Sequence, residues 1–166
     1  IFPSDVKYGI ALPGVSTHRR TPIVVGKDSQ AVVSAKVFKR AWGGANIKSV
    51  KLVYRVNAGA WVESTMVATQ VAVDSTFSAK IPKQNPGDYS YYFISVVDSN
   101  QLVTRLANTG NLTQFDTSKG VFFYKVIDRS TQPVLTIRDA QYTPFINGRT
   151  PYMSAVDSVG GIVTSD

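Results

Sequence analysis

Side chains able to perform acid–base or metal chemistry are few and widely spaced in this sequence. The single histidine, His18, is followed by Arg19 and Arg20 and lies far from any acidic cluster, and cysteine is absent. A histidine-rich or thiolate metal site is therefore excluded, and a Ser-His-Asp triad would depend on one histidine with no nucleophile elbow nearby. We expect no catalytic residue, no metal site and no cofactor in this chain.

The acidic residues form neither a catalytic nor a calcium-binding pattern. Glu63 is the one glutamate among 11 acids, and Asp74 is the nearest acid with which it could form a glycosidase pair. The Asp98-Ser99-Asn100 run offers oxygen ligands, but three adjacent residues lack the spaced carboxylates of a dedicated calcium loop. We interpret these acids as solvated or capping residues of turns.

Aromatic rings are the other candidates for ligand contact, because exposed rings can stack on sugars. Among them we take four as candidate ligand-binding residues for a polysaccharide: Trp42, Trp61, Tyr92 and Tyr124. The alternative is that most of these rings belong to a core, since aromatic side chains supply large buried areas. Two or more coplanar exposed rings on one face would favour sugar binding, whereas full burial of Trp61 and Tyr91 would exclude it.

The net charge of +7 arises from 18 lysines and arginines against 11 acids. Such an excess could attract nucleic acid, an anionic polysaccharide or a membrane surface. Apart from the cluster at 18–20 and a possible stripe of Lys36, Lys51 and Arg55, the cations are spread along expected strands. We interpret most of them as a solvated sheet face and expect no specific nucleic-acid partner. No apolar run approaches the roughly 20 residues that span a bilayer, so we expect no membrane span.

Alternation of apolar and polar residues predicts the elements that must position these side chains. It is clear over residues 31–38, 47–56 and 77–81, with Val53 as an exception, and the aromatic and β-branched run 89–98 indicates a further strand. Further candidate strands are residues 22–25, 61–64, 71–73, 102–106 and 121–127. No segment has a sustained helical period. The sequence predicts an all-β fold: an antiparallel immunoglobulin/fibronectin III-like β-sandwich of about seven strands with an extended C-terminal arm.

Three motifs carry a family resemblance. They read I.SV.L.Y.VN.G.W from Ile47, F.A.IP from Phe77, and G.YSYYF..VVD from Gly87. Together they resemble the immunoglobulin-like or fibronectin III-like modules of large bacterial surface and secreted proteins, over residues 22–129. The resemblance implies a secreted or cell-surface location and neighbouring domains of the same polypeptide as partners. The third motif is one residue longer than is typical, which predicts a β-bulge at residues 95–97.

The C-terminal region has a different pattern. Thr150-Pro151-Tyr152 and the run from Val159 to Asp166 resemble the opening of an OB-like domain. One strand of such a domain has no partners of its own, so it must pair with the sandwich, with a neighbouring molecule, or with residues 135–137. The alternative is an ordinary extended arm of the sandwich. We therefore predict a leader at 1–21, the sandwich at 22–129, a linker at 130–133 and an arm at 134–166.

These expectations favour a non-catalytic structural, spacer or assembly module of a multidomain protein. Two alternatives remain open: a carbohydrate-binding accessory module that uses exposed aromatic rings, and a fragment of an enzyme whose site lies in missing domains. The chain begins with Ile1 rather than Met, which we interpret as the processed or cut end of a longer protein.

Overall fold

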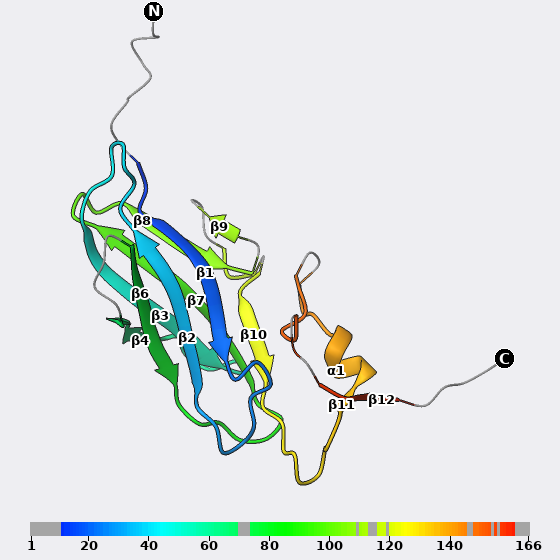
Figure 1. The fold of residues 1–166 in the computed structure, drawn as a ribbon. Coiled ribbons are helices and arrows are strands. Elements are labelled where there is room, and N and C mark those ends of the chain that lie inside the picture. The colour runs from blue at the N-terminus through cyan, green and yellow to red at the C-terminus, as the bar shows by residue number, and fades with distance from the viewer. Residues whose placement is uncertain are drawn as a thin grey trace, which may run out of the picture.

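Two antiparallel sheets pack face to face in the computed structural model, which describes residues 11–69, 74–108, 110–112, 116–118, 120–145, 148–153, 155 and 157–161 (Figure 1). The first sheet has the order β1–β2–β6–β5. Its strands are β1 (Gly14–Thr21), β2 (Ala31–Phe38), β6 (Asp74–Ile81) and β5 (Val67–Ala68). The predicted all-β antiparallel sandwich is confirmed.

The second sheet has the order β4–β3–β7–β8–β9, and β10 also pairs with β7. Its strands are β4 (Val62–Thr65), β3 (Ile47–Val56), β7 (Tyr89–Asp98), β8 (Val103–Ala107), β9 (Gly110–Leu112) and β10 (Phe122–Lys125). One edge of β7 is paired along its length with β3. The other edge is divided between β10, opposite residues 89–92, and β8, opposite residues 94–97.

The core between the sheets follows from the two-residue period of the strands. In β2, Ala31, Val33, Ala35 and Val37 are buried and the residues between them are half-buried. In β7 the inward positions are Ser90, Tyr92, Ile94, Val96 and Asp98, all buried. The largest fully buried side chains of this core are Tyr92, Tyr124, Leu52, Ile81 and Ile94.

The second sheet is apolar on its outer face as well. Val53, Phe93, Ala107 and Val121 form a separate buried cluster there, against which Trp61, Tyr91 and Phe145 pack. Val53 interrupts the alternation of its strand because it points to this outer cluster, not to the main core. Phe145 belongs to the C-terminal arm, so the arm covers part of a sheet face that would otherwise expose large apolar side chains.

The first strand lies where we expected a leader. β1 pairs antiparallel with β2, with Arg20 opposite Val33 and Thr21 opposite Val32. The predicted strand at residues 22–25 is wrong, because the chain bends there after a cis peptide bond at Thr21-Pro22 and residue 26 contributes only an isolated bridge to Ile127. Proline lacks the N–H that a strand ladder requires. Of the inward positions of β1, Val15 is apolar but the later ones are occupied by His18 and Arg20, so no hydrophobic alternation marks the strand.

The bulge predicted at residues 95–97 is also wrong. Residues 90–97 of β7 pair without interruption with residues 56–49 of β3, and the register shift lies on β3 between Ile47 and Ser49. Val96 is therefore buried and Val97 half-buried, as simple alternation requires. The strand expected at residues 71–73 lies outside the described residues.

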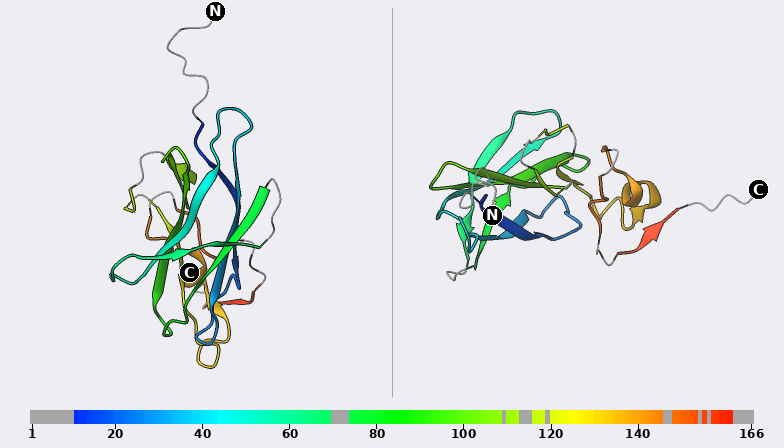
Figure 2. Two further views of the ribbon diagram at one scale, coloured as in Figure 1. Left: turned by 90° about the vertical axis from the view of Figure 1, so that its left-hand side faces the viewer. Right: turned by 90° about the horizontal axis from the view of Figure 1, so that it is seen from above.

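The C-terminal arm forms a small unit beside the end of the sandwich (Figures 1 and 2). It contains β11 (Leu135–Thr136), the short helix α1 (Ile137–Gln141) and β12 (Val159–Gly160), and β11 pairs in parallel with β12. The late strand thus pairs with the region of residues 135–137, one of the three partners expected for it. Ile127, Leu135 and Tyr152 form a buried cluster that joins this unit to the sandwich. Within the described part of the chain, no helix has the length and apolar character needed to cross a bilayer.

Replacing Ile94 with alanine tests the central packing. Ile94 is fully buried between the sheets, so its truncation should lower the free energy of unfolding by about 2–5 kcal/mol. The matched control is Ile137→Ala, the same chemical change at a side chain that is 47% exposed, which should cost less than about 1 kcal/mol. Urea denaturation followed by tryptophan fluorescence measures both values. Equal losses in the two variants would contradict the described core.

Candidate functional site

The two tryptophans singled out from the sequence lie at opposite ends of β3. Trp42 precedes the strand and is 90% exposed, whereas Trp61 follows it and packs edge-on against Phe93 at 5.3 Å between ring centroids. A ten-residue strand spans roughly 30 Å. The two rings therefore do not form one platform.

The two candidate tyrosines are part of the core. Tyr92 is 0% exposed and Tyr124 is 1% exposed, with their ring centroids 6.3 Å apart. Both occupy inward positions, so neither ring presents a face to solvent. Tyr91, the outward neighbour of Tyr92, is half-buried on the outer face of the second sheet. The structure thus does not bring Trp42, Trp61, Tyr92 and Tyr124 together into one binding surface.

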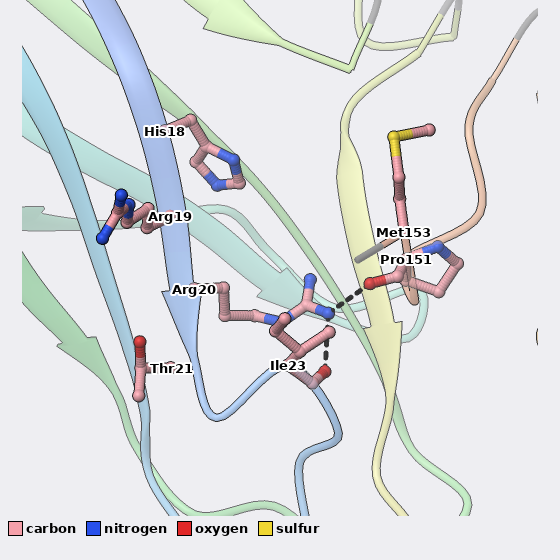
Figure 3. Close-up of a pocket in the computed structure, with 7 residues that line it drawn as sticks. All are labelled: His18, Arg19, Arg20, Thr21, Ile23, Pro151 and Met153. Atoms are coloured by element: carbon pink, nitrogen blue, oxygen red, sulfur yellow. Dashed lines mark hydrogen bonds between the residues drawn. The ribbon is translucent and has the colours of Figure 1, made fainter. Parts of the chain in front are cut away.

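A pocket of about 630 Å³ lies where β1 meets the C-terminal arm (Figure 3). One wall is β1 and the residues after it, and the other is the arm, although these segments are about 130 positions apart in the chain. The lining residues are His18, Arg19, Arg20, Thr21, Ile23, Pro151 and Met153. Strand alternation turns His18 and Arg20 inward and leaves Arg19 exposed on the opposite side, as Figure 3 shows.

Arg20 is the best-connected side chain of this pocket and is only 8% exposed. Its Nη2 donates to the carbonyl oxygens of Ile23 (2.8 Å) and Pro151 (2.7 Å), and its Nη1 donates to the carbonyl of Phe123 (3.3 Å). The guanidinium also lies 4.9 Å from the centroid of the Tyr124 ring. Within the described residues no carboxylate pairs with it, so neutral acceptors and an aromatic face compensate the buried charge.

His18 is connected to Arg20 through Tyr92. Arg20 Nη1 donates to the Tyr92 hydroxyl (3.4 Å), which lies 2.9 Å from Nε2 of His18. The direction of the bond between the phenol and Nε2 follows the tautomer of His18. The His18 ring stacks on Phe122 at 3.8 Å between centroids. Burial, together with the charge of Arg20, lowers the pKa of His18 to about 4, so the imidazole is neutral near pH 7.

In this arrangement the hydrogen bonds of Arg20 and His18 connect segments of the chain to one another. A catalytic histidine needs a nucleophile to deprotonate and an acceptor that orients it, and here Nε2 is engaged by a core tyrosine. Nowhere in the described part of the chain do three histidine or acidic side chains converge as a metal site would require. The sequence pointed to His18-Arg19-Arg20 only as a basic cluster. Arg20 lies two residues after His18, so in a strand both side chains lie on the same face. No apolar pattern in the sequence showed that these residues form a strand.

The lowered pKa of His18 predicts a pH-dependent stability. The unfolded histidine titrates near pH 6.5 and the folded one near 4, so the unfolded state binds more protons between these values. Stability is therefore complete above pH 6.5 and falls as the pH is lowered, by roughly 2.5 kcal/mol at pH 4.5. Urea denaturation at several pH values measures the slope. His18→Gln should abolish it, and an unchanged slope in that variant would assign it to other groups.

The sequence was compared with known proteins. No protein-family model matches it, and a search of the curated proteins found no significant match. A β-sandwich supports many unrelated activities, so the function has to be argued from the contacts of this chain.

Proposed function

We propose that this chain is a non-catalytic structural or spacer module, of immunoglobulin/fibronectin III-like type, in a secreted or cell-surface multidomain bacterial protein. In this role the sandwich holds its C-terminal arm in a fixed position and so sets the orientation of a neighbouring domain of the same polypeptide. The inference rests on how the polar groups at the β1–arm pocket are used.

The observation that carries the proposal is the bonding of Arg20. One guanidinium joins three separate parts of the chain, namely the turn after β1, strand β10 and the arm, through the carbonyls of Ile23, Phe123 and Pro151. These donors are directed to backbone within the molecule, which favours a junction over a ligand site. Removing a cation from water costs on the order of several kcal/mol, and the bonds of Nη1 and Nη2 offset this cost, whereas the buried Nε has no partner among the described residues.

Other contacts support a fixed arm. Asn108 Nδ2 donates to the carbonyl of Arg149 at 3.1 Å and Lys125 Nζ donates to Asp139 at 3.0 Å, which ties the sandwich to the arm, while a bond from Thr150 Oγ1 to the carbonyl of Ala140 lies within the arm itself. Arg129, the last residue of the predicted sandwich, forms an ion pair with Asp157 of the arm. The polar and apolar contacts together bind the arm at several points along its length.

The strand order supports the immunoglobulin-like part of the proposal. In constant-type immunoglobulin sandwiches, strands A, B, E and D form one sheet and strands C, F and G form the other. If β1 to β8 correspond to A, B, C, C′, D, E, F and G, the sheets β1–β2–β6–β5 and β4–β3–β7–β8 become A-B-E-D and C′-C-F-G. Strands β9 and β10 are then additions on the G side.

Substituting Arg20 tests the junction. In Arg20→Met, backbone amides of the arm, such as those of Leu135, Tyr142 and Tyr152, should exchange with deuterium at least tenfold faster, because their segment loses its anchor. Amides in β2 and β7 should keep their protection. Hydrogen–deuterium exchange with mass spectrometry measures both regions.

Arg19→Met is the matched control, since it removes the same charge from an exposed neighbour. It should leave the exchange of the arm unchanged. Arg20→Lys, which retains the charge but loses the planar fork of donors, should behave like Arg20→Met. Wild-type protection of the arm in both Arg20 variants would overturn the proposal.

A further inference from the structure

The outer face of the second sheet carries a row of aromatic side chains. Alternation turns Tyr89, Tyr91 and Phe93 of β7 outward, opposite to the buried Tyr92. The arm adds Tyr142, whose ring lies edge-on to Tyr89 at 5.7 Å between centroids. Tyr142 is 40% exposed, so this end of the row is open to solvent.

A second pocket, of about 420 Å³, lies at this end of the row. Its lining includes Tyr89 and Tyr142 as aromatic walls and five polar residues from β10 and the arm: Lys125, Gln132, Thr136, Arg138 and Asp139. Pockets that bind small ligands combine apolar or aromatic walls with a few placed polar groups, which is the composition seen here.

The one carboxylate lining this pocket, Asp139, is already paired with a lysine and two other side-chain donors. Asp139 accepts from Lys125 Nζ (3.0 Å), Gln132 Nε2 (2.7 Å) and Thr136 Oγ1 (2.8 Å). Burial raises the pKa of Asp139, but these hydrogen bonds outweigh burial and leave the pKa below its ordinary value. Asp139 is therefore a charged, fully engaged group that fixes Lys125 and Gln132 in place.

Arg138 supplies the charge that remains available. Its side chain is exposed and forms no hydrogen bond or ion pair with any residue that the structure describes, whereas the other cation of the pocket, Lys125, is paired with Asp139. A guanidinium presents a planar fork of donors that matches a carboxylate. A ligand with an apolar ring face for the tyrosines and a carboxylate for Arg138 would use both features.

We infer that this pocket binds a carboxylated sugar residue of an acidic polysaccharide, of the uronic-acid type. The C–H face of the sugar lies on Tyr142, its hydroxyls meet Gln132 and Thr136, and its carboxylate pairs with Arg138. A nucleic acid fits less well, because the angle of 60° between the two tyrosine rings gives no parallel stacking platform for bases. This binding site goes beyond the proposed spacer role. It rests on that role in one respect, because Tyr142 and Arg138 belong to the arm and face Tyr89 only while the arm keeps its position.

The test is isothermal titration calorimetry of the full chain with oligogalacturonate at 0.15 M salt, with neutral dextran and single-stranded DNA as comparisons. We expect saturable binding of oligogalacturonate and none of dextran or DNA. Tyr142→Ala and Arg138→Gln should each weaken binding at least tenfold, whereas Tyr142→Phe, which keeps the ring, should stay within about threefold of the wild type.

Two controls separate the site from general surface effects. Arg19→Gln removes the same charge elsewhere, and Trp42→Ala removes an exposed ring at the opposite end of β3; both should bind within twofold of the wild type. Near-UV circular dichroism verifies the fold of each variant. The inference would be overturned if Arg19→Gln weakened binding as much as Arg138→Gln, or if dextran bound as well as oligogalacturonate. It would also be overturned if DNA bound more tightly or if oligogalacturonate did not bind. If oligogalacturonate does not bind but the backbone amides of the arm are protected from exchange, the sugar site alone is overturned. The proposed spacer role then stands.

Discussion

The structure depends on one buried cation and the neutral groups that satisfy it. Arg20 is withdrawn from water without a carboxylate partner among the described residues, and its stability rests on carbonyl oxygens that three separate segments must supply together. Because an unpaired buried charge is so unfavourable, those segments are constrained to one arrangement. The same guanidinium donates to the Tyr92 hydroxyl, which is hydrogen-bonded to His18, so the core tyrosine and histidine are linked to this junction.

The arm and the sandwich are also coupled by apolar surface. The second sheet has buried side chains on both of its faces, and the arm contributes Phe145 to the outer cluster and Leu135 and Tyr152 to the cluster at the end of the sandwich. Apolar packing supplies the attraction, while Arg20 selects the position, because hydrogen bonds are directional and apolar contacts are not. The outer pocket beside Tyr142 is a consequence of this position, since its two walls come from β7 and from the arm.

Much of the sandwich could be predicted from the sequence, because its central strands alternate apolar and polar residues. Strands β2, β3, β6 and β7 lie within a few residues of their predicted bounds. β1 was missed because two of its inward residues are His18 and Arg20, whose burial depends on partners more than 70 positions away. The expected bulge in β7 was wrong, because the register shift between the two strands lies on β3, between Ile47 and Ser49. The sequence of β7 alone does not show how its partner is aligned with it.

The candidate ligand residues were predicted less well, for a physical reason. In the run from Tyr89 to Phe93 the register decides which tyrosines face the core, and a shift of one residue exchanges the two faces. Tyr92 was chosen as an exposed ring but faces inward, whereas Tyr89 was not chosen and faces outward. Tyr142 becomes relevant only because the arm folds back against Tyr89, a contact across more than 50 residues.

The central claim is that the arm occupies one fixed position on the sandwich. The chain has no cysteine, so spin labels can be attached at two introduced cysteines, Lys80→Cys on the exposed side of β6 and Arg149→Cys on the arm. Double electron–electron resonance then reports the distribution of distances between them. We expect a single narrow distribution that becomes broad when Arg20 is replaced by methionine. A broad distribution in the otherwise native chain would mean that the arm is not fixed on the sandwich.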